Sequence, residues 1–140
     1  MKDQLIFDYV ILVDDDTIIN HVHELLINKQ HITKKIKSYL NPLEAVTAIQ
    51  ALLLQDHLKI LVLLDLNMPE MTGFEFLDKI GQLENKAQLL EVLIVSSSID
   101  AQDISKSNRH PLVRQYIPKP LNSKIIAGIM KGYSHLATQS

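Results

Sequence analysis

The chain has 140 residues, 46% of them hydrophobic, with 14 Lys and Arg against 16 Asp and Glu and a net charge of −2. This describes a single globular domain, residues 1–140 with a core from about residue 8 to 136. The absence of Cys excludes thiol catalysis, Cys-ligated zinc and disulfides, and a charge balance without a basic block argues against direct binding of nucleic acid.

The remaining composition excludes further classes. None of the four glycines lies in a phosphate-binding loop of the kind that nucleotide enzymes require. The N-terminal residues lack the features of a signal peptide, and no apolar run approaches the roughly 20 residues that span a bilayer. We therefore expect a cytoplasmic protein without membrane insertion.

Short apolar runs predict the strands. Residues 9–13 (YVILV), 60–64 (ILVLL) and 92–95 (VLIV) are apolar without alternation, as in strands that a parallel sheet buries on both faces. Weaker candidates run through residues 36–40 and 113–117.

Between these runs the apolar residues recur with a helical period. The first helix should begin after an N-cap at Asp16, and we expect its apolar residues to face inward and its polar residues outward. The inward set is Ile18, Ile19, Val22, Leu25 and Leu26, and the outward set is Asn20, His21, His23 and Glu24. Because residues two apart do not face each other on a helix, the two histidines are interpreted as surface residues.

Three later helices have start signals, and a fourth segment is weak. Asn41 precedes Pro42, Thr72 and Glu75 have capping-box spacing, and Asn122 can cap the last helix. Residues 100–108 predict only a short, marginal helix. The expected inward residues are Ala45, Val46, Ile49, Leu52, Leu53, Phe76, Leu77, Ile80, Leu83, Ala101, Ile104, Ile125, Ile126, Ile129, Met130 and Tyr133. This alternation predicts an α/β fold with a doubly wound parallel sheet.

Polar residues follow the predicted strands, where open parallel sheets bind their ligands. Asp14 and Asp15 follow the first strand, Asp65 the third, Ser96 the fourth and Lys119 the fifth. If the first and third strands are neighbours, their carboxylates converge and suit Mg²⁺. Asp65 could then act as a nucleophile toward phosphorus.

Four motifs at these positions resemble one family. They are ILVDDD at 11–16, LLDLNMPEMTGFEFL at 63–77, VLIVSSS at 92–98 and YIPKP at 116–120. The chain resembles the CheY-like receiver domain of two-component response regulators, in its stand-alone single-domain form. The resemblance implies a flavodoxin-like sheet of five parallel strands in the order 2-1-3-4-5, with five helices.

The resemblance also implies roles for individual residues. Asp65 would be the phosphoacceptor, and Mg²⁺ would be held by Asp14, Asp15, Asp65 and the backbone carbonyl of Asn67. Lys119 would bind the phosphoryl group, and Ser96 would be the switch hydroxyl, which is Thr in most members.

Three more positions follow from the same likeness. Tyr116 would be the switch aromatic residue, although ordinary packing explains it equally well. Asn67 and Ser98 stand where the family tunes the lifetime of the phosphorylated state, and Ser98 could equally be a solvated loop serine. The Lys119–Pro120 bond would be cis, which X-Pro bonds tolerate.

The implied function is Mg²⁺-dependent acceptance of a phosphoryl group from a histidine kinase or a histidine phosphotransfer protein, without enzymatic turnover. The first helix would contribute to kinase docking, and the face of the fourth helix, fifth strand and fifth helix would contact an unknown protein target. The expected state is a monomer or a phosphorylation-dependent dimer.

Two other functions are compatible with parts of the pattern. Asp14 and Asp16 have the Asp-x-Asp spacing of a phosphatase like the haloacid dehalogenases, with Ser96 and Lys119 as partners, although Ile18 departs from that motif. A receiver fold that binds partners without phosphorylation is the third reading.

Overall fold

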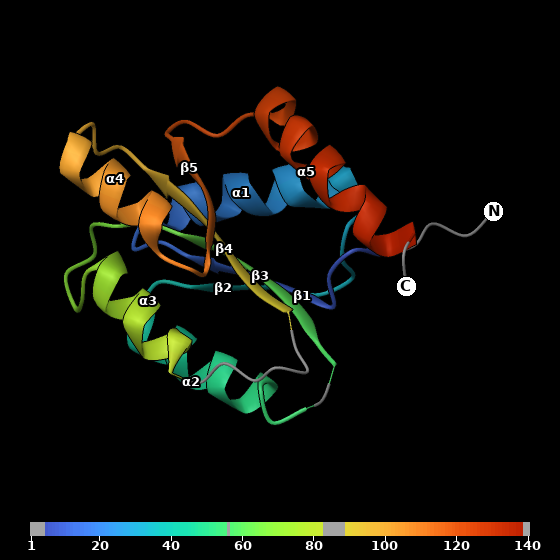
Figure 1. Cartoon of the computed structure of the whole chain (residues 1–140), viewed down its shortest axis with the longest axis horizontal. Helices are drawn as coiled ribbons and strands as arrows, with labels where there is room; N and C mark the ends of the chain where they lie inside the picture. The colour runs from blue at the N-terminus through green and yellow to red at the C-terminus, as the bar shows by residue number, and fades with distance from the viewer. Residues whose placement is uncertain (1–4, 56, 83–88, 139–140) are drawn as a thin grey trace.

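The computed structural model describes residues 5–55, 57–82 and 89–138, in which five strands and five helices alternate (Figure 1). The strands are β1 (Tyr9–Val13), β2 (Ile36–Tyr39), β3 (Lys59–Leu64), β4 (Leu89–Ser96) and β5 (Val113–Pro118). The helices are α1 (Thr17–Gln30), α2 (Pro42–Leu52), α3 (Gly73–Gly81), α4 (Ala101–Arg109) and α5 (Ser123–Thr138). No helix within these residues is long and apolar enough to cross a membrane.

The strands form one parallel sheet in the order β2-β1-β3-β4-β5, which confirms the predicted fold. Val13 lies opposite Leu64, and Leu64 lies opposite Ile94. The residues that follow β1, β3 and β4 therefore emerge at the same edge of the sheet. This register positions the candidate site.

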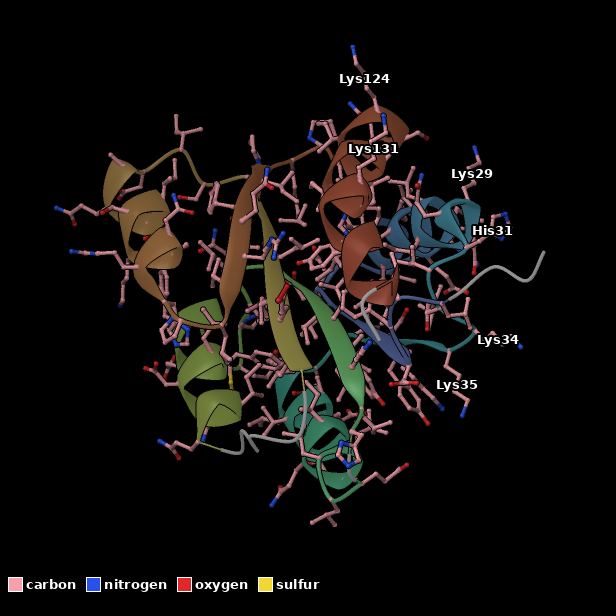
Figure 2. All side chains as sticks on the ribbon, turned by 45° about the vertical axis from the view of Figure 1, so that its right-hand side comes forward. Lys29, His31, Lys34, Lys35, Lys124 and Lys131 are labelled. Atoms are coloured by element: carbon pink, nitrogen blue, oxygen red, sulfur yellow. The ribbon has the colours of Figure 1, made fainter. Side chains whose placement is uncertain are left out.

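Each face of the sheet has its own apolar core. Helices α2 and α3 pack on one face, and α1 and α5 lie side by side on the other. Side chains fill the space between the helices and the sheet on both faces (Figure 2). Helices therefore cover the central strands on both faces of the sheet, which explains the continuous apolar sequence of these strands.

Helix α1 is rotated relative to the prediction. It buries Asn20, His23 and Ile27, whereas Ile18 is 73%, Val22 40% and Leu25 52% exposed. The assignment of an apolar face inward and a polar face outward was therefore wrong for these positions.

A polar contact accounts for this rotation. The Asn20 side-chain amide donates hydrogen bonds to the carbonyl oxygens of Asp14 at 3.0 Å and Tyr39 at 3.2 Å. The Asp16 carboxylate caps the helix by accepting from the backbone N–H of Ile18 at 2.9 Å, as predicted. Because these contacts attach the first turn to the ends of β1 and β2, the face that carries Asn20 must turn toward the sheet.

Helix α4 also differs from expectation in its buried face. Ala101 is exposed and Ile104 half-buried, while Ser107 is fully buried. The Ser107 hydroxyl donates to the carbonyl of Asp103 at 2.7 Å, which satisfies its hydrogen-bonding capacity inside the fold. The expected inward position Leu83 lies outside the described residues.

Candidate functional site

The ends of β1 and β3 bring three carboxylates together. Asp14, Asp15 and Asp65 each offer an oxygen atom, and these atoms all lie within 4.8 Å of one another. Asp14 and Asp65 are buried, whereas Asp15 is exposed. The sequence prediction that these residues converge is correct, because β1 and β3 are neighbours in the sheet.

Lys119 enters the same site from the end of β5. Its ammonium group lies 2.8 Å from an Asp14 carboxylate oxygen and 3.5 Å from an Asp65 oxygen. The Lys119 backbone N–H donates to the carbonyl of Ser96 at 2.9 Å, which ties it to the end of β4. The Lys119–Pro120 bond is cis, as predicted.

Burial raises the pKa of Asp65 above its usual range, and the neighbouring charge of Asp14 raises it further. Lys119 and a hydrogen bond from the backbone N–H of Asn67 oppose this shift. Burial alone would lower the pKa of Lys119, but its hydrogen bonds and charge interactions with Asp14 and then Asp65 together outweigh burial and raise it. The ammonium therefore stays charged beside a carboxylate that gains from added positive charge.

Gly73 lies in close contact with the backbone of Asp65. A Cβ atom at Gly73 would lie 2.9 Å from the Asp65 carbonyl oxygen and 2.8 Å from the Leu66 side chain. The Gly73 N–H donates to the Leu66 carbonyl at 2.8 Å, and the predicted Thr72–Glu75 capping box starts α3 at this point. The first turn of α3 is thus packed directly against the loop that carries Asp65.

The other sequence candidates form a hydrogen-bonded group at the start of the β4–α4 loop. Ser96 is fully buried, and its hydroxyl accepts from the backbone N–H of Ser98 at 3.2 Å. The Tyr116 hydroxyl donates to the Ser98 carbonyl. The Ser98 hydroxyl donates to the Asp103 carboxylate at 2.7 Å. Ser98 therefore connects β4, β5 and α4 and is more than a solvated loop residue.

Sequence reasoning missed two residues beside the site, Asn20 and His23. Both are buried on the face of α1 that turns toward the sheet, so the interpretation of His23 as a surface residue was wrong. Burial lowers the pKa of His23, Asp14 partly opposes the shift, and Lys119 adds to it. Asn20 lies one turn after the Asp16 cap, and a polar residue at that place in an apolar helix was the available signal.

The donor set can hold a hard divalent cation. Mg²⁺ prefers oxygen ligands and usually binds through one or two carboxylates while it keeps several waters. The three clustered carboxylates supply such ligands, and exposed Asp15 leaves the site open to water. Burial and then the charge of Asp14 raise the pKa of Asp65, and a bound cation would favour its ionised form.

The family model of the response regulator receiver domain matches residues 10–130. A two-component response regulator from Cytophaga hutchinsonii is 25% identical, with a TM-score of 0.76 over 92% of this chain and 98% of that one. A receiver protein from Dyadobacter fermentans is also 25% identical, with a TM-score of 0.74 over 89% and 96%.

A third solved structure is the complex of CheX with CheY, BeF3 and Mg²⁺ from Borrelia burgdorferi. It is 21% identical, with a TM-score of 0.72 over 90% of this chain and 89% of that one. No curated protein sequence matches the chain. Together with the fold, the family match shows that the chain belongs to the response regulator receiver domains, a family of two-component signalling.

Proposed function

We propose that this receiver domain accepts a phosphoryl group on Asp65 from the phosphohistidine of a histidine kinase or a histidine phosphotransfer protein. The observation that carries the proposal is the convergence of Asp14, Asp15, Asp65 and Lys119 from three strand ends. The structure also resembles a CheY complex that contains BeF3 and Mg²⁺.

In the proposed transfer, a carboxylate oxygen of Asp65 forms a bond to phosphorus, and the phosphorus–nitrogen bond of the donor breaks. The donor histidine keeps the electron pair as neutral imidazole, and Asp65 becomes an acyl phosphate. Lys119 supplies positive charge to the transferred oxygens. Mg²⁺, held by Asp14, Asp15, Asp65 and the Asn67 carbonyl, would add charge neutralisation when bound.

The hydrogen bonds of Ser98 support a route from the site to the surface. If the Ser96 hydroxyl turns toward the phosphoryl group, it releases the Ser98 N–H that it now accepts. Ser98 also holds Tyr116 and Asp103, so a shift of this residue biases both β5 and α4. We assign Ser96 and Tyr116 to the switch and Ser98 and Asn67 to control of the phosphorylated lifetime.

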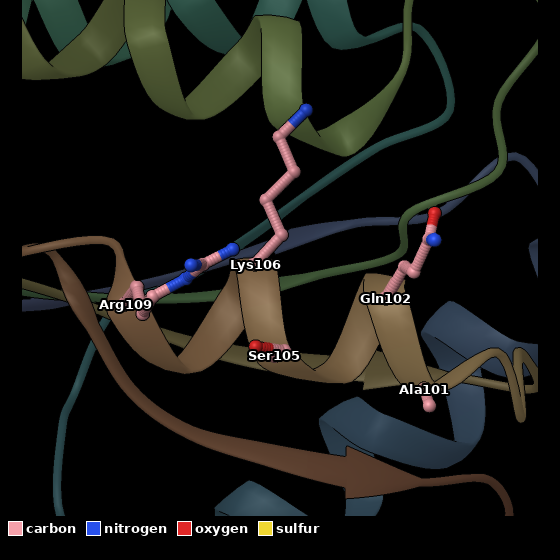
Figure 3. Close-up of a pocket in the computed structure, with 5 residues that line it drawn as sticks. All are labelled: Ala101, Gln102, Ser105, Lys106 and Arg109. Atoms are coloured by element: carbon pink, nitrogen blue, oxygen red, sulfur yellow. The ribbon is translucent and has the colours of Figure 1, made fainter.

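Exposed side chains on α1 and on α4 support the two proposed docking faces, one for the phosphodonor and one for a downstream protein. On α1, the exposed apolar residues Ile18 and Val22 lie one turn apart and fit a helix of the phosphodonor. On α4, a shallow hollow of about 430 Å³ is lined by Gln102, Lys106 and Arg109, among others, and Lys106 points toward α3 (Figure 3). We assign the latter side, α4 with β5 and α5, to a downstream protein.

Intact-mass measurement with acetyl phosphate, with and without Mg²⁺, tests the phosphoacceptor. Wild type should gain one phosphoryl group only with Mg²⁺, and Asp65→Asn should gain none. Asp16→Asn is the matched control, because Asn also caps helices and should leave the adduct intact. Failure of the wild type to form an adduct would contradict the proposal.

The contacts of Asp14 oppose the phosphatase alternative. One carboxylate oxygen accepts from the Asp16 N–H at 2.9 Å, and the other binds the Lys119 ammonium. A nucleophile with both oxygens engaged is poorly available for attack on phosphorus. The same experiment separates the two functions, since a phosphatase would keep forming adducts in Asp65→Asn and release phosphate over many turnovers.

A further inference from the structure

Basic side chains gather on one side of the molecule. Figure 2 shows them on one side of the molecule, from the end of α1 through the α1–β2 connection and onto α5. We call this the basic face, and its members are Lys29, His31, Lys34, Lys35, Lys124 and Lys131. All six side chains are exposed.

The segments that build the basic face contain no acidic side chain. Residues 25–43 and 104–140 include neither Asp nor Glu. Lys124 and Lys131 are seven residues apart on α5, so both lie on the same side of that helix. Glu24 and Glu44 flank the first segment in sequence. Asp8 lies beside Thr33, and its carboxylate already accepts from the Lys59 N–H at 2.8 Å. No Asp or Glu side chain within these two segments is therefore available to neutralise the lysines of this face.

The α1–β2 connection holds its lysines in an ordered backbone. His31 ends α1 in the left-handed conformation, with its N–H donating to the Asn28 carbonyl. The buried Thr33 hydroxyl lies 3.2 Å from the Asp8 carbonyl and accepts from the Lys35 N–H at 3.2 Å. A preorganised backbone lowers the entropy lost on binding, which suits a docking surface.

The surroundings of the basic face favour a protein as its partner. Leu25, 52% exposed, precedes Lys29 by one turn on the same side of α1, so an apolar contact borders the charge.

We propose that the basic face docks an acidic segment of another protein that also carries apolar side chains. The lysines would bind the carboxylates, and Leu25 would contact an apolar side chain of the segment. This interaction does not rest on phosphorylation of Asp65, so either proposal can fail while the other holds.

The test measures binding of the full chain to a fluorescent peptide of repeated Glu-Glu-Leu-Glu by anisotropy. The patch variant is Lys34→Glu in the α1–β2 connection, and the control variant is Lys79→Glu on α3. Both substitutions change the net charge equally and replace exposed residues. Thermal unfolding and phosphorylation by acetyl phosphate verify that both variants are folded.

Wild type should bind the peptide more weakly as NaCl is added, because salt screens exposed charges. The patch variant should lose at least about fivefold in affinity, while the control should stay within about twofold of wild type, because repulsion acts at the contact. Equal losses in both variants, or no binding by wild type, would overturn the proposal. Tighter binding to phosphatidylserine vesicles or duplex DNA than to the peptide would also overturn it.

Discussion

The folded structure disfavours the ionised form of the Asp65 carboxyl group. Its folded-state pKa is raised by burial first and by Asp14 next, so ionisation costs the folded state more than the unfolded chain. As pH rises from the unfolded pKa near 3.8 toward the raised value, stability falls, and the loss remains complete at higher pH. A buried charge is thus kept for chemistry at a cost in stability.

Replacing this charge should stabilise the protein. In buffer without Mg²⁺ and near neutral pH, Asp65→Asn should raise the free energy of unfolding by on the order of 1 kcal/mol. Urea unfolding followed by circular dichroism measures the difference. The exposed Asp78→Asn serves as control and should change stability little. A less stable Asp65→Asn protein would show that Lys119 outweighs burial and Asp14.

His23 makes the stability of the folded protein depend on pH in the opposite direction. Because burial lowers its folded-state pKa, the unfolded chain binds the proton more tightly, and stability falls as pH drops below the unfolded value of 6.5. Between about pH 7 and about pH 5.5, wild type should lose more unfolding free energy than His23→Gln. His21→Gln, changed at an exposed position of the same helix, should behave like wild type. Identical pH profiles for all three proteins would contradict this account.

At the scale of elements, Gly73 at the start of α3 is tightly packed, whereas Gly128 within α5 has open space beside it. Gly73 starts α3 against the backbone of Asp65, whereas an added Cβ at Gly128 in α5 meets nothing within 4 Å. Gly73→Ala should therefore destabilise the protein by about 2 kcal/mol through overpacking, and Gly128→Ala should stabilise it by up to about 1 kcal/mol through helix propensity. Urea unfolding of both variants checks the signs. Phosphorylation should slow only in Gly73→Ala, because only that change displaces Asp65.

The Ser98 hydroxyl connects the β4–α4 loop to the start of α4. Ser98→Ala removes its hydrogen bond to Asp103 and the one it accepts from the Asp100 N–H at 3.3 Å, while keeping the backbone contacts with Ser96 and Tyr116. Amide hydrogen exchange of residues 101–109, measured by mass spectrometry, should become faster, because the start of α4 loses an anchor. The adjacent exposed Ser97→Ala is the control and should leave exchange unchanged. Unchanged hydrogen exchange in both variants would show that the Ser98 hydroxyl does not anchor α4.

At the scale of the whole molecule, ion binding and folding are linked through the carboxylate site. A ligand that binds only the folded state adds about 2.7 kcal/mol of stability at about 100 times its Kd. Mg²⁺ should therefore raise the unfolding free energy of wild type. Asp15→Asn should lose most of this increase, since its carboxylate belongs to the cluster. Asp16→Asn, altered in the neighbouring cap, should retain it, and equal losses in the two variants would argue against the assigned ligands.

Local patterns in the sequence determined much of the fold and the site. The central strands were recognisable because burial on both faces requires uninterrupted apolar residues, as in β3 (Lys59–Leu64). Caps such as Asp16 and the Thr72–Glu75 box depend on contacts within a few residues. The site residues were recognisable because parallel strands deliver their ends to one edge of the sheet, so position in the chain already implies proximity.

The tertiary structure alone decided which sides of α1 and α4 are buried. In α1, hydrogen bonds of Asn20 to two strand ends outweigh the apolar period, so His23 is buried and Leu25 is exposed. Periodicity measures amphipathicity and says nothing of polar contacts with other elements. The pairing of Lys119 with Asp14 joins residues 105 positions apart, so its distance and its effect on the pKa arise only when the sheet has formed.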